Sequence, residues 1–417
     1  MRVSDIQVVS VAAGCELRAR VACETEQAPY AERVIEPFDL WYRFPAWCRD
    51  YLRPDNGDPF LTALLVPAMT LGEALEIPAP VSPALLRALP EIQSILHCFD
   101  ARQTRIDVVA PERDEPLPRN DERRRFGLFY SLGIDSFYSL LKNERDHPRD
   151  AETITHLISV HGMEVWHEAW DERFPPAFLA NCQRVATASG KTLMPVSTNL
   201  RAVTDDLALW PMSHGAGLAS IALALGGCFG TVRISATTTY DKLFPWGSHP
   251  VLDPLWSTDD VRFVHDGCEM DRIDKTRIVA ASPLALETLQ VCPGYTGEYN
   301  CGRCLKCLRT MIDLLQAGVL DRCQTLPHSI DAEDLRQSLA GYRRRLSPLS
   351  LAGYRRRHDA FTDDAHADLR AVLADLLAAE EQPTRVQPRP APDSARESGR
   401  PFRGWLRRQR HTRDWQD

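Results

Sequence analysis

The sequence predicts an α/β protein built around a doubly wound, mainly parallel β-sheet. Between residues 126 and 320, short apolar runs typical of buried strands alternate with helical segments, which is the pattern of a parallel sheet covered by helices on both faces. Hydrophobic residues make up 44% and charged residues 25% of the 417 residues, the balance of a soluble globular protein. A chain of this length predicts two or three domains.

The first 122 residues are expected to form an α+β module. Residues 6–12 and 16–23 are expected to pair as a hairpin, and 34–44 alternates loosely and carries aromatic residues, as strands do. Apolar residues at helical spacing predict a helix over 85–99, and 106–109 is expected to be a short strand.

The alternation of strands and helices follows this module. Strands are expected at 126–130, 154–160, 192–196 and 232–236. Helices are expected at 136–142, 177–189 and 218–225. The expected division of the chain is an α+β module at 1–122, an α/β domain at 123–320, a helical segment at 321–380 and a disordered basic tail rich in Pro and Arg at 381–417.

Charge and apolar runs exclude several classes of protein. The formal net charge of −8 argues against a surface that binds nucleic acid throughout. No apolar run reaches the roughly 18 residues of a membrane helix, and the apolar stretch at 6–13 is too short for an export signal. The twelve cysteines are not spaced as the disulfide framework of a small secreted protein. We therefore expect a cytoplasmic protein.

A short motif after the first of these strands is suited to phosphate. The strand at 126–130 runs into Ser131-Leu-Gly-Ile-Asp-Ser136 and then into a helix, whose first N–H groups and positive dipole end favour an anion. Gly133 lets the backbone approach the ligand, and the serine hydroxyls add donors. Asp135 is placed to cap the helix or to help hold Mg²⁺. The alternative is an ordinary strand–helix turn with a polar cap.

Four cysteines share the spacing C-x8-C-x2-C-x2-C. They are Cys292, Cys301, Cys304 and Cys307. Four thiolates at this spacing can complete a tetrahedron around Zn²⁺, giving a closed structural site. The rival is a [4Fe–4S] cluster, because C-x2-C-x2-C also occurs in ferredoxins, although no Cys-Pro step follows Cys307 at the ferredoxin spacing.

The phosphate motif resembles the Ser-Gly-Gly-x-Asp-Ser signature of the PP-loop ATP pyrophosphatases. Leu132 stands where that family has its first glycine, and its side chain is expected to reshape the pocket. The resemblance implies a sheet of the PP-loop (HUP) type that binds ATP and Mg²⁺. The nucleotide-binding residues implied are Ser131, Leu132, Gly133, Ile134, Asp135, Ser136 and His161. A buried strand-end histidine is the alternative for His161, and a helix cap at Ser213 is the alternative for a nucleotide-facing segment at 213–217.

The motif and the cysteine spacing together resemble the 7-cyano-7-deazaguanine synthase branch, over about residues 126–315. The resemblance implies that ATP adenylates the carboxylate of a 7-carboxy-7-deazaguanine-like acid and releases pyrophosphate. A nitrogen nucleophile then displaces AMP to give an amide, a nitrile or a related conjugate. The catalytic residues implied are Asp135 and Lys275, with Lys242, Arg272 and Arg277 as further candidates for stabilising charge; the alternative for these cations is an ordinary surface position. The substrate-binding residues implied are Asp241, Lys242 and Asp253. The zinc knuckle is expected to brace the substrate side.

Two other functions stay open. An RNA sulfurtransferase of the PP-loop type would need a redox-active cysteine pair or an iron–sulfur cluster, and a nucleotide-sensing scaffold would bind ATP without turnover. The repeat at 339–345 and 351–357 is expected to present solvated arginines rather than a nucleic-acid patch. The expected partner is a small acid, with neither nucleic acid nor membrane. A protein partner held by the N-terminal module or the basic tail stays open, as does a homodimer.

Overall fold

The computed structural model describes residues 1–12, 14–117, 125–148, 151–163, 175–292, 300–342, 348–362 and 364–381. Apart from its first residue, the predicted disordered tail lies outside these ranges. Within them, the structure has no helix whose length and apolar character would let it cross a bilayer.

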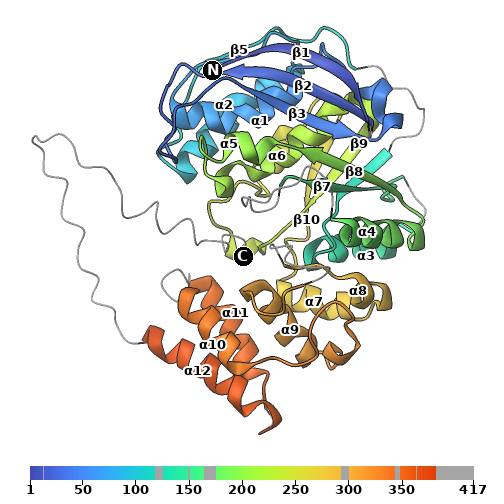
Figure 1. Cartoon of the computed structure of the whole chain (residues 1–417), viewed down its shortest axis with the longest axis vertical. Helices are drawn as coiled ribbons and strands as arrows, with labels where there is room; N and C mark the ends of the chain where they lie inside the picture. The colour runs from blue at the N-terminus through green and yellow to red at the C-terminus, as the bar shows by residue number, and fades with distance from the viewer. Residues whose placement is uncertain are drawn as a thin grey trace, which may run out of the picture.

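One mixed sheet runs through the described part of the chain (Figure 1). Its ten strands stand in the order β10-β9-β6-β7-β8-β3-β2-β1-β4-β5. The strands are β1 (Arg2–Val11), β2 (Gly14–Ala22), β3 (Phe38–Phe44), β4 (Leu75–Glu76), β5 (Val108–Val109), β6 (Arg125–Phe129), β7 (His156–His161), β8 (Thr192–Thr198), β9 (Phe229–Ser235) and β10 (Arg262–Asp266). Every strand expected from the sequence is present, and β4 and β10 are additional.

The five strands β10-β9-β6-β7-β8 are all parallel. Chain order reverses at β6, because β7 and β8 follow on one side of it while β9 and β10 lie on the other. In doubly wound sheets, ligands bind beyond the carboxyl ends of the strands at such a reversal. The rest of the sheet is mixed, because β3 pairs antiparallel with β8 and brings the predicted hairpin of β1 and β2 with it.

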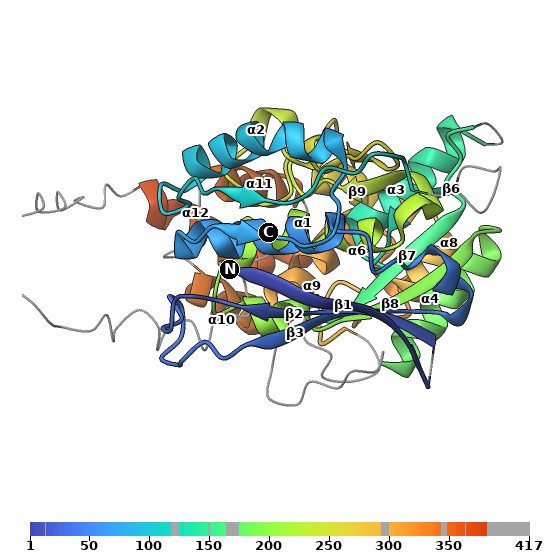
Figure 2. The same ribbon diagram turned by 90° about the horizontal axis from the view of Figure 1, so that it is seen from above.

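Helices cover both faces of the parallel strands. They are α1 (Asp58–Leu71), α2 (Pro83–Phe99), α3 (Ile134–Asp146), α4 (Pro176–Ala188), α5 (Leu200–Thr204), α6 (Trp210–Ala224), α7 (Arg272–Ala280), α8 (Pro283–Thr288) and α9 (Leu305–Gln316). A first core packs with α1, α2 and α6, and a second core packs with α3, α4, α7, α8 and α9. Figure 2 shows α1 and α2 over one face of strands β1 to β3.

Alternate residues of the parallel strands enter the two cores. The first core receives Phe129, Ile158 and Met194, and the second receives Leu128, Leu157 and Leu193. Neighbouring side chains of a strand point to opposite faces, so the apolar runs seen in the sequence are those of strands buried on both sides. The first core also joins residues 1–117 to α6, β9 and β10, so the sequence segments before and after residue 122 share one sheet and one core.

The C-terminal segment consists of α10 (Ala332–Tyr342), α11 (Pro348–Asp359) and α12 (Ala367–Glu381), which pack against α9 in a third core. The expectation of solvated arginines is wrong for Arg357, because its side chain is buried and pairs with Asp313 of α9. Burial of this arginine is possible because a carboxylate accompanies it. Residues 343–345 of the first repeat lie outside the described ranges.

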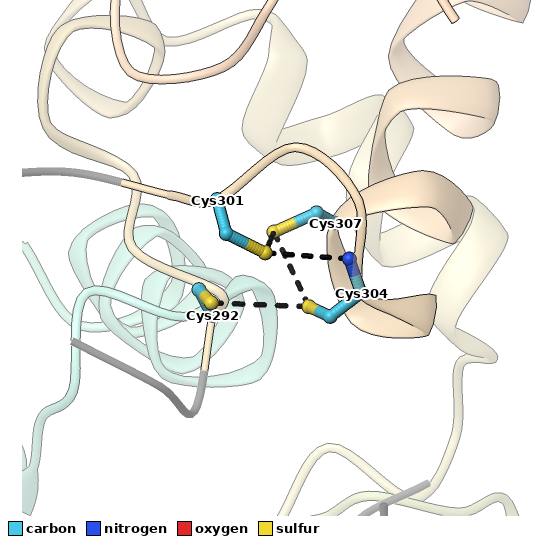
Figure 3. Close-up of side chains that lie close together, drawn as sticks. All are labelled: Cys292, Cys301, Cys304 and Cys307. Carbon is cyan, nitrogen blue, oxygen red and sulfur yellow. Dashed lines mark hydrogen bonds between the residues drawn. The ribbon is translucent and has the colours of Figure 1, made fainter. Parts of the chain in front are cut away.

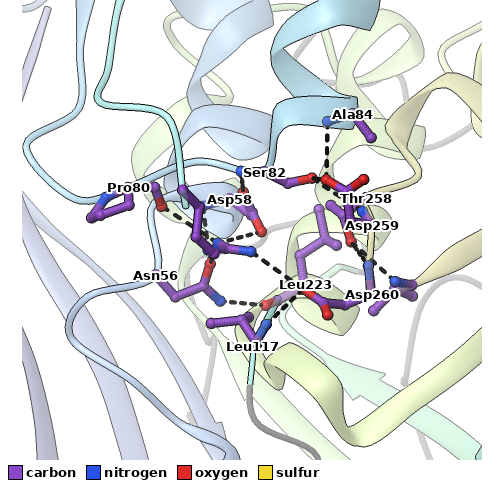
Figure 4. A network of polar contacts seen from close by, with 12 residues as sticks. Asn56, Asp58, Pro80, Ser82, Ala84, Leu117, Leu223, Thr258, Asp259 and Asp260 are labelled. Carbon is purple, nitrogen blue, oxygen red and sulfur yellow. Dashed lines mark hydrogen bonds and ion pairs between the residues drawn. The ribbon is translucent and has the colours of Figure 1, made fainter. Parts of the chain in front are cut away.

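A buried ion network joins α1 to the turn before β10 (Figure 4). The Arg113 guanidinium donates to the carboxylates of Asp58 (2.7 Å) and Asp260 (3.3 Å) and to the side-chain oxygen of Asn56 (2.8 Å). Asn56, Asp58 and Asp260 are labelled in Figure 4. Asp58 also accepts the backbone N–H of Ser82 at 2.7 Å. Burial raises the pKa of Asp58, and the charge of Arg113 opposes that shift. The network therefore ties the N-terminal residues to the parallel half of the sheet.

Replacing Arg113 with Ala removes the cation that two buried carboxylates share. We expect the free energy of unfolding to fall by about 3–5 kcal/mol in urea denaturation, because the carboxylates stay desolvated without their partner. Arg87→Ala, which removes an exposed cation 3.9 Å from Asp259, is the control and should change it by less than about 1 kcal/mol. An Arg113→Ala protein as stable as the wild type would contradict this assignment.

Candidate functional site

A cavity of about 320 Å³ opens where the strand order reverses. Ser131 after β6, Val160 near the end of β7 and Thr237 after β9 line it, so it lies beyond the carboxyl ends of these strands. Ligand pockets commonly measure about 300–1,000 Å³, so this cavity is at the small end of that range. Its walls also include residues of α6, α7 and α9.

The predicted phosphate loop forms one wall of the cavity. Ser131, Gly133, Ile134, Asp135 and Ser136 all line it. The Ser136 hydroxyl donates to the carbonyl of Gly133 (3.0 Å) and accepts the N–H of Ser131 (3.3 Å), which closes the loop on itself. Gly133 occupies the N-cap position of α3 without a side-chain cap, so the expectation that Asp135 caps this helix is wrong.

Leu132 adopts the backbone conformation that the first glycine of the family motif would favour. Its φ is 59°, in the left-handed region that leucine rarely enters. The side chain is fully buried in the second core and is not among the residues that line the cavity. Its carbonyl accepts the N–H of Gln290 at 2.9 Å. The expectation that this side chain reshapes the pocket is therefore wrong, because the side chain packs into the second core and not into the cavity.

Asp135 is paired with two cations of α7. Its carboxylate accepts from Arg272 at 2.8 Å and from Lys275 at 3.3 Å. Arg272 lines the cavity, whereas Lys275 is 1% exposed, does not line it, and donates to the carbonyl of Ala236 at 2.6 Å. The predicted catalytic lysine therefore contacts the cavity only through Asp135, with which it forms an ion pair. Its other contact connects α7 to the end of β9.

Two cations that sequence reasoning missed face the same cavity. Lys306 and Arg309 of α9 line it together with Arg272, and we call these three residues the cation wall. A separation of three residues places Lys306 and Arg309 on one side of a helix. Burial, together with the charges of Arg272 and Arg309, lowers the pKa of Lys306 to about 8. The sequence could have indicated these two cations, because they lie in Cys-Leu-Lys-Cys-Leu-Arg (304–309), which contains two of the predicted metal ligands.

The four predicted cysteines converge on one point (Figure 3). Their Sγ atoms all lie within 4.8 Å of one another, with separations of 3.4 Å (Cys304–Cys307), 3.8 Å (Cys292–Cys304) and 3.9 Å (Cys301–Cys307). Four thiolates around one Zn²⁺ at about 2.3 Å stand roughly 3.8 Å apart, so the group can hold such an ion. Hydrogen bonds from Cys292, Cys304 and Cys307 lower the pKa of Cys301, which favours a thiolate.

Aromatic side chains form another part of the cavity wall. Trp210 and His214 of α6 and Trp246 line it, with the His214 and Trp246 rings 5.1 Å apart and edge to face. Burial lowers the pKa of His214 to about 4, so this imidazole is neutral at physiological pH. The alternative of a helix cap at Ser213 is wrong, because α6 begins at Trp210.

The remaining predicted site residues do not line the cavity. His161 is buried at the end of β7, and Asp241 and Lys242 lie in a surface turn. Asp253 is fully buried and accepts from the Ser248 hydroxyl (2.7 Å) and from Nδ1 of His265 (2.6 Å). Ser248 does line the cavity, so Asp253 is connected to the cavity through its hydrogen bond with Ser248.

Comparison with protein-family models, with curated proteins and with solved structures finds no match to this chain. The function is therefore inferred from the residues and their geometry.

Replacing Cys304 with Ser removes one of the four convergent thiols. We expect the purified wild type to carry about one Zn²⁺ per chain, and we expect the variant to lose most of it and to melt at a lower temperature, because such sites contribute directly to folding. Elemental analysis and thermal denaturation check this. Cys98→Ser, at an exposed cysteine, is the control. Equal metal content in both variants would contradict a metal site here.

The pair of His265 and Asp253 predicts a pH dependence of stability. Burial alone would lower the pKa of His265, but the hydrogen bonds and charges of Asp253 and Cys268 together outweigh it, Asp253 most of all, and raise the pKa from 6.5 to about 9. The stabilisation is therefore complete below pH 6.5 and is lost as the pH rises through 9.

We expect His265→Gln to be less stable than wild type by on the order of 3 kcal/mol at pH 6, and by much less at pH 10. Urea denaturation at the two pH values measures the difference. His358→Gln, at a histidine beside Asp359, is the control. A deficit that is the same at both pH values would show that the ion pair is not responsible.

Proposed function

We propose that this protein is an ATP-dependent synthase or ligase of the PP-loop type, related to the 7-cyano-7-deazaguanine synthases. In this proposal it adenylates the carboxylate of a 7-carboxy-7-deazaguanine-like acid, releases pyrophosphate and forms a carbon–nitrogen bond. The observation that carries the proposal is that the loop 131–136 and the cation wall share one cavity at the reversal of the sheet. The strand order β8-β7-β6-β9-β10 supports a sheet of the HUP type.

The cation wall suits the triphosphate of ATP. Arg272 of α7 and Lys306 and Arg309 of α9 line the same cavity as the first residues of α3, and Arg272 pairs with Asp135 of that helix. Clustered like charges repel one another, and a bound polyphosphate relieves that repulsion. The same cations would stabilise the negative charge that develops on the leaving pyrophosphate during reaction. Asp135 is the loop carboxylate that can hold Mg²⁺, which would neutralise further phosphate charge.

The proposed reaction is a two-step acyl transfer. A carboxylate oxygen of the acid attacks the α-phosphorus of ATP, the bond to the bridging oxygen breaks, and pyrophosphate leaves. A nitrogen nucleophile then attacks the acyl carbon, AMP leaves with the bonding electron pair, and the nitrogen loses its proton to water. A second ATP can activate the resulting amide oxygen for dehydration to a nitrile. The protein contributes chiefly position and positive charge, as is usual for phosphate chemistry.

The aromatic wall suits a planar heterocyclic acid. Trp210 and Trp246 offer ring faces and edges, and the neutral imidazole of His214 lies between them. The indole nitrogen of Trp210, a residue that lines the cavity, is buried and has no hydrogen-bond partner among the described residues. Buried polar groups normally have a partner, so this nitrogen supports a polar ligand in the cavity.

The metal centre favours a structural zinc over an iron–sulfur cluster. Sγ separations of 3.4–3.9 Å suit a single ion, whereas a cube of iron and sulfide would hold the thiolates farther apart. Since all four thiols point to one centre, both Cys-x-x-Cys pairs are used there, which disfavours the sulfurtransferase alternative. A filled four-thiolate site has no open position, so its role is to fix the start of α9 and with it Lys306.

Replacing Lys306 with Met tests the proposed adenylation. With Mg-ATP and a panel of acids that includes 7-carboxy-7-deazaguanine, we expect AMP and pyrophosphate from the wild type, and a rate lower by about 10²–10³-fold in the variant, because one donor to the transition-state charge is lost. Arg145→Ala, at the exposed far end of α3, is the control. ATP binding without AMP for every acid would favour the sensing scaffold, and bound iron and sulfide would favour RNA sulfur transfer.

A further inference from the structure

The C-terminal helical segment contacts both helices that carry the cation wall. Arg356 and Arg357 are adjacent on α11, and they pair with acidic residues of α7 and α9 respectively. Figure 1 shows α11 beside α9, on the same side of the molecule as α7. The described contacts therefore connect a segment more than 200 residues from the phosphate loop to the cavity.

Arg357 forms a bidentate pair with Asp313. Its Nε and Nη2 donate to the two carboxylate oxygens at 2.8 and 2.7 Å, and the two side chains are 5% and 0% exposed. Asp313 lies four residues after Arg309 on α9, so the two side chains emerge from the same side of that helix. The Asp313 carboxylate therefore lies one helical turn from Arg309 and outside the lining of the cavity, where it is paired with Arg357.

Arg356 fixes the start of α7. It donates to the carboxylates of Asp271 and Asp274, and the Asp271 side chain caps α7 by accepting the N–H of Asp274 at 3.1 Å. The next residue after this cap is Arg272, which lines the cavity and pairs with Asp135. Both cation-bearing helices are therefore held by neighbouring arginines of one C-terminal helix.

The charged groups near the cation wall determine the effect of removing Arg357. Burial lowers the pKa of Arg272, Asp135 and Asp313 oppose that shift, and Arg309 and Arg357 add to it, so all these groups share one electrostatic environment. A buried carboxylate that loses its partner is left as an uncompensated charge. The charge of Asp313 already acts on Arg272, and Arg309 lies one turn away on the same helix, so without Arg357 these cations of the wall are available to Asp313.

We propose that Arg356 and Arg357 are positioning residues for nucleotide binding, which keep Asp271 and Asp313 engaged and the cation wall directed at the cavity. This inference rests on the proposed ATP-dependent function. It makes the C-terminal segment a part of the ATP site, although none of its described residues lines the cavity.

The test measures Mg-ATP binding to the full-length, metal-loaded chain by calorimetry. Arg357→Met should weaken ATP affinity about tenfold, because Asp313 then competes with phosphate for the wall. The double variant Asp313→Asn/Arg357→Met removes that competitor and should restore affinity to within about threefold of wild type. Arg336→Ala, at an exposed pair on α10, is the control and should bind as wild type does.

Rescue by the double variant is the readout that a merely structural role would not give. Folded Arg357→Met with wild-type affinity, or a double variant as weak as the single one, would overturn the inference. If Arg357→Met does not fold, Arg356→Gln decides, since its side chain is 39% exposed: about threefold weaker binding supports the inference and unchanged binding overturns it. A wild type that does not bind Mg-ATP would instead overturn the proposed function, and this inference with it.

Discussion

The pairing of Asp135 with Arg272 and Lys275 is the interaction on which the site depends. It joins α3, which follows the loop 131–136, to α7, and Lys275 extends the contact to the carbonyl of Ala236 after β9. A buried ammonium is tolerated only where such partners surround it, and Lys275 is 1% exposed, so α3, α7 and the segment after β9 are held together at one point. The cavity lies directly in front of that point.

The positive charge of the cation wall is balanced by negative groups that do not line the cavity. A filled four-thiolate zinc centre would carry a net charge of roughly −2, and Cys304 already raises the pKa of Lys306 against its burial. Asp313, which lies on the same helix α9 and pairs with Arg357, adds a second negative charge. The proposed metal centre and the C-terminal segment therefore have a common effect, which is to make a buried group of cations tolerable before an anion binds.

Features encoded in short stretches could be predicted from the sequence, and features created by long-range packing could not. The loop 131–136 and the cysteine group are contiguous patterns, and the structure brings each together. Helix α1 has no amphipathic pattern, because 12 of its 14 residues are buried, and it escaped prediction. Arg309 became a site residue only through the placement of α9. Asp253 shows the converse, since an acid that the resemblance implied as a substrate-binding residue is buried and contacts the cavity only through Ser248.

The left-handed leucine in the phosphate loop has a consequence for how the site forms. An unfolded chain visits the φ of 59° readily at glycine and seldom at leucine, so the curve of the loop is not available in advance at Leu132. It exists because the side chain is anchored in the second core. Local opening of the loop must pull an apolar side chain into water, so its amide hydrogens should exchange with solvent only when that core also opens. The loop is thus a cooperative part of the fold rather than a flexible flap.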